Sequence, residues 1–120
     1  MSRDHRKLRV FILADRLVPE IYSATNDFPL SERFGLQAQM RREAISAACN
    51  IVEGSARRTT GEYVNFLNIA AGSAAEVRYL VDLAYRLGFV GEIDRTTLIS
   101  DYTELAAGLQ ALIRSVSPDP

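Results

Sequence analysis

Residues 93–116 read IDRTTLISDYTELAAGLQALIRSV, and this stretch decides the fold class. Its large apolar side chains recur at alternating intervals of four and three residues: Leu98, Tyr102, Leu105, Leu109, Leu112 and Val116. An α-helix repeats every 3.6 residues, so this spacing places all six side chains on one face. The stretch therefore predicts a long amphipathic helix with one buried side.

Three earlier segments show the same periodicity and are separated by turn signals. We expect helices over about residues 6–25, 36–56 and 60–87. Pro19 lies inside the first segment and predicts a kink there, because proline removes one backbone hydrogen bond. Gly54 and Ser55 mark the end of the second segment. A short turn is expected between the first two helices, at residues 30–34.

The third segment has recognisable signals at both ends. Thr59-x-x-Glu62 is a capping-box pattern directly before an apolar run, and Gly88 is suited to end the helix. No segment alternates with a period of two, so no strand is predicted. Four helices with short connections favour an antiparallel up-down four-helix bundle. We therefore predict an all-α fold with one domain over residues 1–120.

The third segment is apolar on more than one side. Phe66, Ile69 and Leu80 form a second stripe beside the main one. A helix of a monomeric bundle usually needs only one apolar stripe. The second stripe indicates either a wide core face or a surface buried against another subunit, which makes these three residues candidates for an oligomer interface.

The composition is typical of a soluble globular domain. The chain has 120 residues and a net charge of −1, and no apolar run approaches the ~18 residues that a membrane span needs. No signal peptide is predicted. Cys49 lies among apolar residues, so we expect its thiol to be buried. It is the single cysteine and has no second cysteine for an internal disulfide, so we expect a reducing, cytoplasmic location.

Motifs for catalysis and metal binding are missing from the sequence. His5 is the single histidine, so neither a histidine pair for a metal nor a catalytic triad can form. No cofactor is expected. An enzyme would need a pocket with convergent polar groups around Asn50, Glu53 and Glu76, so a non-enzymatic role is the prediction.

A polar stripe follows the second predicted helix. It contains Gln39, Ser46, Asn50 and Glu53, and Glu76 continues a comparable line on the third helix. Such a stripe is either a solvated face with local ion pairs or a hydrogen-bond network at a subunit or ligand surface. Both interpretations remain open at the level of sequence.

Basic residues are concentrated in the first half of the chain. Residues 1–60 carry ten basic and seven acidic residues, whereas residues 61–120 carry four and eight. The candidates for phosphate contact are Arg41, Arg42, Arg57 and Arg58, followed by Arg3, Arg6, Lys7 and Arg9. A merely solvated surface is the alternative interpretation.

Several of these residues belong to motifs of a known family. Glu32-Arg33-Phe34-Gly35, Asn50-Ile51-Val52-Glu53-Gly54 and Ala70-x-Gly72-Ser73-x-x-Glu76 resemble the signature of bacterial four-helix-bundle proteins encoded in intervening sequences of large-subunit ribosomal RNA genes. That family is similar to the accessory variability determinant of diversity-generating retroelements. The resemblance covers most of residues 8–90.

The resemblance implies a ring-like homopentamer without enzymatic activity. It also implies binding of RNA or DNA and of a protein partner such as a reverse transcriptase. The first functional hypothesis is therefore a homo-oligomeric module that contacts RNA or a nucleoprotein through its basic residues. The second is a scaffold that binds only protein, which the near-zero net charge and the doubly apolar third helix favour.

Overall fold

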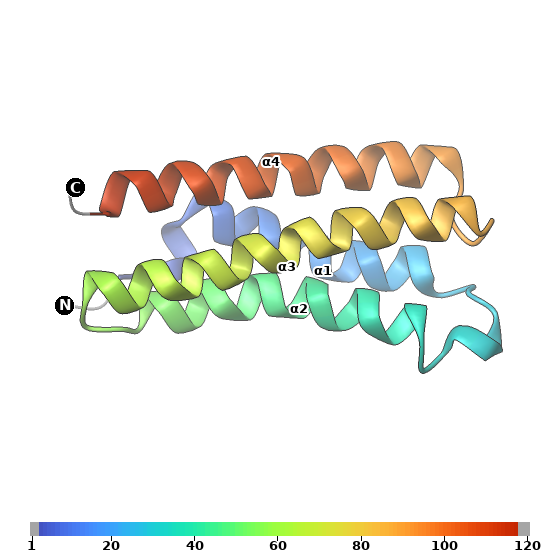
Figure 1. The fold of residues 1–120 in the computed structure, drawn as a ribbon, viewed down its shortest axis with the longest axis horizontal. Coiled ribbons are helices and arrows are strands. Elements are labelled where there is room, and N and C mark those ends of the chain that lie inside the picture. Colours follow the sequence, from blue (N-terminus) through green and yellow to red (C-terminus); the bar gives the residue numbers. More distant parts are fainter. Residues whose placement is uncertain (1–2, 118–120) are drawn as a thin grey trace.

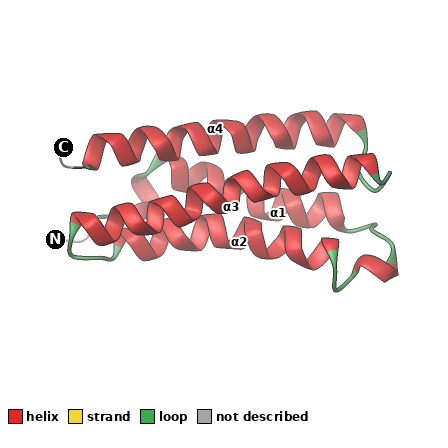
Figure 2. Ribbon diagram, in the orientation of Figure 1, coloured by secondary structure: helices red, strands yellow, loops and turns green. Residues whose placement is uncertain are grey.

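The chain folds into four helices, shown by a computed structural model that describes residues 3–117. The helices are α1 (Arg9–Thr25), α2 (Leu36–Ser55), α3 (Thr60–Arg86) and α4 (Glu92–Val116). Each helix packs against the next one along the chain, and α4 also packs against α1 (Figure 1). The described residues contain helices and loops without a strand (Figure 2). The predicted all-α, antiparallel four-helix bundle is therefore confirmed.

The connections follow the predicted turn signals. The α2–α3 turn lies at the same end of the bundle as the two chain ends, and the α1–α2 loop and the α3–α4 turn lie at the opposite end (Figure 1). Short 3₁₀ helices, η1 (His5–Lys7) and η2 (Leu30–Glu32), precede α1 and α2. The helix α1 continues through Pro19, so the kink expected there does not interrupt the helix.

Local hydrogen bonds explain why α3 begins and ends where it does. The Thr59 hydroxyl accepts a hydrogen bond from the Glu62 backbone N–H at 3.1 Å and donates one to the Glu62 carboxylate at 2.9 Å. At the other end Gly88 has a φ of 81°, a left-handed conformation that costs glycine little. The Phe89 N–H then reaches back to the Ala84 carbonyl at 2.9 Å and closes the helix end.

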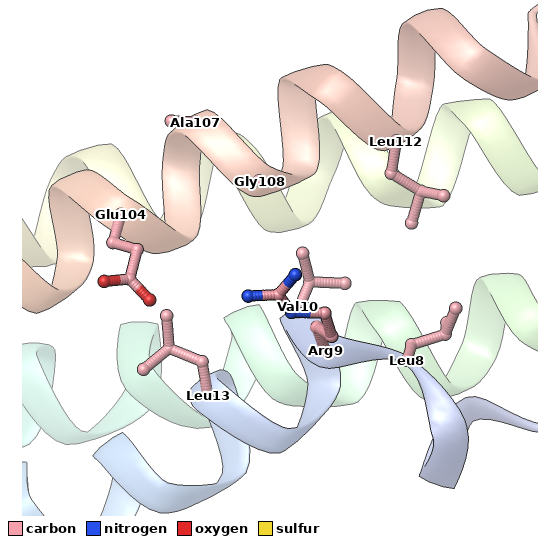
Figure 3. A pocket seen from close by; sticks show the side chains of 8 residues that line it. All are labelled: Leu8, Arg9, Val10, Leu13, Glu104, Ala107, Gly108 and Leu112. Carbon is pink, nitrogen blue, oxygen red and sulfur yellow. The ribbon is translucent and has the colours of Figure 1, made fainter.

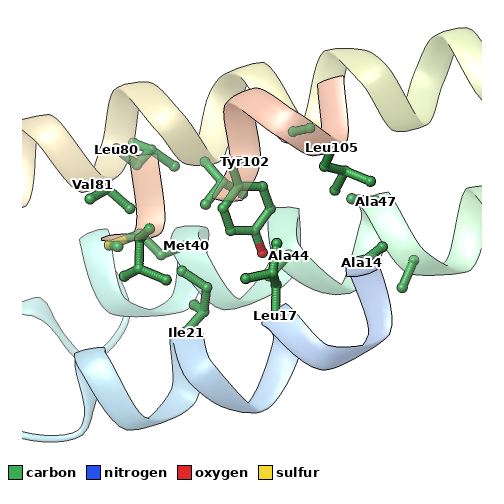
Figure 4. Packing of buried hydrophobic residues seen from close by; sticks show 14 of the residues in the cluster. Ala14, Leu17, Ile21, Met40, Ala44, Ala47, Leu80, Val81, Tyr102 and Leu105 are labelled. Atoms are coloured by element: carbon green, nitrogen blue, oxygen red, sulfur yellow. The ribbon is translucent and has the colours of Figure 1, made fainter. Parts of the chain in front are cut away.

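At the centre of the core, small residues of α2 face larger residues of other helices. Ala44 and Ala47 are fully buried, which lets Leu17 of α1 and Tyr102 and Leu105 of α4 approach closely (Figure 4). Sequence periodicity was wrong about parts of α1. The helical spacing of apolar residues in segment 6–25 predicts Ile12 and Tyr22 on the apolar side, but both are exposed, whereas Ala14 and Leu17 are buried. The apolar arc of α1 is wide, so periodicity alone could not settle the rotation of this helix about its axis.

Gly54 lies at a close contact between α2 and α3. A Cβ atom at this position would lie 2.9 Å from Phe66 Cβ and 3.1 Å from Tyr63 Cδ1. Gly54 is itself helical, in the last turn of α2, and it has no left-handed conformation. Sequence correctly indicated the end of a helix here, but the reason for glycine is the packing of two helices and not the turn.

Tyr102 is a buried tyrosine whose hydroxyl has no hydrogen-bond partner among the described residues. Replacing it with phenylalanine is expected to raise the free energy of unfolding by about 1 kcal/mol, because a buried hydroxyl without a partner costs about 1–3 kcal/mol. Denaturant unfolding at neutral pH would measure the change. The exposed Tyr79→Phe variant is the matched control and should differ little from the wild type.

The same residue predicts a loss of stability in alkali. Burial, with a smaller contribution from the Glu20 carboxylate, raises the pKa of the Tyr102 phenol above its usual value near 10. Above pH 10 the unfolded chain therefore loses this proton while the folded chain retains it, so stability falls as the pH rises, at up to ~1.4 kcal/mol per pH unit. The fall should be shallower in Tyr102→Phe, and an unchanged slope would contradict this assignment.

Candidate functional site

A groove at the corner of α1 and α2 gathers basic and aromatic side chains. It has a volume of about 320 Å³ and is lined by Tyr22, Arg33, Phe34, Gln37, Ala38, Arg41, Arg42 and Ile45. We call this set the basic groove. It contains three arginines and no acidic residue. Two of its members, Arg33 and Phe34, come from the loop before α2 and were not among the residues predicted to bind.

Hydrogen bonds of the backbone and of two side chains hold the loop against the start of α2. The Glu32 carboxylate accepts a hydrogen bond from the Leu36 N–H at 3.2 Å, and the Gly35 N–H donates to the Glu32 carbonyl at 3.1 Å. The Gln37 amide donates to the Thr25 carbonyl at 2.7 Å and so ties α2 to the end of α1. Phe34 is consequently presented to solvent by a structured loop, with 88% of its surface exposed.

Arg41 mainly joins the two helices that form the groove. Its Nε donates to Thr25 Oγ1 at 2.9 Å, and an Nη donates to the Tyr22 carbonyl at 3.3 Å. The guanidinium also lies over the Tyr22 ring, 4.4 Å from its centroid. Sequence predicted Arg41 as a phosphate contact, but two of its five N–H donors bond to α1 and its guanidinium packs on the Tyr22 ring. Its structural role is to fix one wall of the groove.

Arg33 and Arg42 are the freer cations of the groove. Both are exposed, and neither forms an ion pair with a described residue. The Arg33 guanidinium lies 5.7 Å from the centroid of the Phe34 ring. A cation next to an aromatic ring at the N-terminal end of a helix, where the helix dipole is positive, suits an anionic ligand.

The other predicted basic residues lie elsewhere in the fold. Arg57 forms an ion pair with Glu53 at 2.6 Å and covers the Phe66 ring, and Arg58 is exposed beyond the end of α2. Arg42 and Ser55, the last residue of α2, are 13 positions apart, which is about 20 Å at 1.5 Å per residue. The predicted group of four arginines is therefore divided between opposite ends of the bundle.

The basic residues near the N-terminus are also dispersed. Arg3 lies over the Tyr63 ring, 4.1 Å from its centroid, and its backbone N–H donates to the Ser55 carbonyl. Arg6 pairs with Asp4 at 2.9 Å, and the exposed Arg9 lines a different depression. The side chain of Lys7 lies outside the described part of the structure.

The predicted polar stripe forms a network in part. Ser46 Oγ lies 2.8 Å from Ser73 Oγ of α3, and Asn50 Nδ2 donates to both the carbonyl and the hydroxyl of Ser46. Glu53 forms an ion pair with Arg57, whereas Gln39 and Glu76 are exposed. The network joins α2 to α3, and Ser73 is a member that sequence did not identify as a site residue.

Of the three predicted interface residues, one belongs to the core. Leu80 is only 8% exposed and packs inside its own chain, which corrects its prediction as a contact to another subunit. Ile69 is 44% exposed and Phe66 is half-buried beneath Arg57. The second apolar stripe of α3 therefore splits into a core part and an outer part.

A larger groove lies between α1 and α4. It has a volume of about 670 Å³ and is lined by Leu8, Arg9, Val10, Leu13, Glu104, Ala107, Gly108 and Leu112 (Figure 3). We call it the apolar groove, because its walls are mainly aliphatic. Figure 1 shows that the last turns of α4 extend past the start of α1.

The prediction of a buried Cys49 thiol is wrong, because the residue is exposed on α2. Within residues 3–117, no group of three or more histidine, cysteine, aspartate or glutamate side chains is placed to hold a metal ion. None of the helices described combines the length and apolarity of a membrane span. The basic groove and the apolar groove are two surface features of the described residues that could bind a partner.

Comparison with known proteins matches most of the chain both to a family model and to solved structures. The model of the family described as 23S rRNA-intervening sequence protein matches residues 6–111. A crystal structure from Bacteroides thetaiotaomicron, of a protein with unknown function from the S23 ribosomal protein family, is similar in fold with a TM-score of 0.81. The two sequences are 23% identical, and the match covers 88% of this chain and 95% of the other. No curated protein matches the chain.

Proposed function

Because the chain belongs to the 23S rRNA-intervening sequence protein family, we propose that it is a non-enzymatic, homo-oligomeric binding module that contacts RNA through the basic groove. The family match confirms the resemblance found in the motifs around Phe34, Asn50 and Gly72. The proposed assembly is a ring of five copies, and the proposed location is the cytoplasm. The RNA is free or part of a nucleoprotein, in which a protein such as a reverse transcriptase is a further proposed partner.

The observation that carries the proposal is the charge of the basic groove. Arg33 and Arg42 are exposed there without an acidic neighbour in the lining, although the whole chain has a net charge of −1. A local excess of positive charge attracts a phosphate backbone even where the net charge of the protein does not. Arginine is well suited to this contact, because its planar guanidinium can donate two parallel hydrogen bonds to a phosphate.

Assembly would make such a small site effective. Two free arginines on one copy provide few phosphate contacts, so binding by a single copy is expected to be weak. Copies joined in one assembly present several grooves to the same RNA, and the later contacts form at a high effective concentration. Oligomerisation and RNA binding are therefore coupled parts of one proposal.

A salt titration tests the RNA contact. We expect a fluorescein-labelled 12-nucleotide single-stranded RNA to bind with an affinity that falls with salt. Two phosphate contacts per bound copy give a slope of about −1.4 in log–log form, or about sevenfold weaker binding per copy between 50 and 200 mM salt. Arg42→Ala should weaken binding and reduce the slope. Arg114→Ala is the matched control, because Arg114 is exposed on α4 outside both grooves.

Light scattering on the same samples tests the assembly. A folded protein that is a monomer at micromolar concentration would refute the oligomeric part of the proposal. The RNA part would be refuted by a folded protein without detectable binding at 50 mM salt, or by equal losses in Arg42→Ala and Arg114→Ala. The two parts are thus judged by separate measurements.

A scaffold that binds only protein is the second candidate function. The apolar groove favours it, because an open aliphatic depression of this size is a common feature of protein-binding surfaces. The same experiment separates the two candidates. An oligomer that does not bind RNA at low salt would support the scaffold over the RNA-binding module.

A further inference from the structure

Phe34 is the most exposed large apolar side chain of the basic groove. It retains 88% of its surface, next to Arg33 on the loop and Arg42 on α2. Keeping a phenyl ring in water forgoes most of the stabilisation that burial of phenylalanine gives. The hydrogen bonds from Leu36 and Gly35 to Glu32 nevertheless fix the loop on both sides of this residue. The ring is therefore held outward, with its apolar surface available to a ligand.

We infer that the basic groove takes an unpaired nucleotide of RNA, with its base stacked on Phe34 and its phosphates at Arg33 and Arg42. This inference rests on the proposed function and specifies the form of RNA that is bound. Aromatic side chains beside arginines are the usual platform for single strands, because every base offers a π face. Bases inside a duplex are already stacked on each other and cannot reach the ring.

The size and polarity of the groove agree with one nucleotide. Its volume of about 320 Å³ lies at the lower end of small-ligand sites, which span roughly 300–1,000 Å³. Tyr22 is less suited to stack on a base, since the Arg41 guanidinium lies 4.4 Å from its ring centroid, whereas Arg33 lies 5.7 Å from the centroid of the more exposed Phe34 ring. Gln37 uses its amide nitrogen on the Thr25 carbonyl, which leaves the amide oxygen as an acceptor for a base amino group.

The first turn of α2 adds a second attraction for the phosphate. Gly35 precedes the helix without a side-chain cap, and the Leu36 N–H is satisfied by Glu32. The following N–H groups belong to Gln37 and Ala38, which both line the groove. These groups and the positive end of the helix dipole favour a phosphate in the groove that Arg33 and Arg42 line.

Paired binding measurements on one RNA sequence test the inference. A labelled 12-nucleotide single strand and its duplex with the complementary strand are titrated with wild-type protein and three variants at 50 mM salt. Phe34→Ala removes the ring, Phe34→Trp retains a stacking face, and Leu30→Ala removes a side chain from the same loop outside the groove. Leu30 is 87% exposed, so it matches Phe34 in its accessibility.

We expect wild-type protein to bind the single strand more tightly than the duplex. Phe34→Ala should raise the Kd for the single strand at least about fivefold, the low end for loss of one stacked base. Its Kd for the duplex should change little. Phe34→Trp should bind the single strand at least as tightly as the wild type, and Leu30→Ala should behave as the wild type on both RNAs.

Three results would overturn the inference while leaving RNA binding itself intact. The first is equal wild-type affinity for single strand and duplex, and the second is an unchanged Kd for the single strand in Phe34→Ala. The third is a lower mass of Phe34→Ala in light scattering with a parallel loss of affinity, which would assign Phe34 to the contact between copies. If wild-type protein binds neither RNA, the proposed function fails as well.

Discussion

Replacing Leu67 with alanine is expected to lower the free energy of unfolding by about 2–5 kcal/mol, the range for large-to-small substitutions in a packed core. Leu67 has no exposed surface and lies on the buried face of α3, the helix that packs against both α2 and α4. The alanine leaves a cavity that these helices cannot close without moving their own side chains. Denaturant unfolding monitored by circular dichroism would measure the change.

Leu30→Ala is the matched control for this substitution. It removes the same atoms from a leucine that is 87% exposed, so the expected change is within about 0.5 kcal/mol. Similar losses in the two variants would contradict the described core. In an oligomer, both proteins should be compared at the same concentration, because assembly contributes to the measured stability.

Replacing Gly54 with valine is expected to cost about 1–3 kcal/mol by overpacking the α2–α3 contact. A Cβ at this position meets Phe66 Cβ at 2.9 Å. That atom is attached directly to the backbone of α3, so it cannot move away without displacing the helix. Valine adds two methyl groups to the same space, and its small advantage over glycine in helix propensity does not compensate.

Gly72→Val places the same substitution on α3 where the structure leaves room. No atom lies within 4 Å of a Cβ built at Gly72, so the expected result is unchanged or slightly raised stability. In thermal unfolding, the melting temperature of Gly54→Val should therefore fall below that of the wild type, whereas that of Gly72→Val should stay the same or rise slightly. If Gly72→Val lowered the stability more than Gly54→Val, the face of α3 that carries Gly72 would have to be covered, for example by another copy of the chain.

The arrangement of the basic groove illustrates how far sequence could lead. Arg42 was predicted as a phosphate contact from its sequence neighbours, and it is exposed in the groove. Arg41, its neighbour in the chain, instead points to Thr25 and Tyr22 on α1. Adjacent residues differ by 100° around a helix, so one of two neighbouring arginines can face a partner helix while the other faces solvent.

Arg33 and Phe34 could have been found from sequence only by their place in the family motif. They lie in a loop, where no periodicity indicates the direction of a side chain. Their position depends on Glu32, which accepts hydrogen bonds from Leu36 and Gly35, and on contacts that close the α1–α2 corner. Cys49 and Leu80 were misplaced for a related reason, since each lies at the edge of a broad apolar arc.

Sequence alone determined the four helices, the two ends of α3 at Thr59 and Gly88, the antiparallel bundle and the family. These properties depend on periodicity, capping and turn residues, which act over a few neighbouring positions. The tertiary structure decided which arginines stay free, why position 54 is glycine, and which apolar side chains face solvent. Those properties depend on the rotation and spacing of helices packed side by side, and contacts between residues far apart in the chain set both.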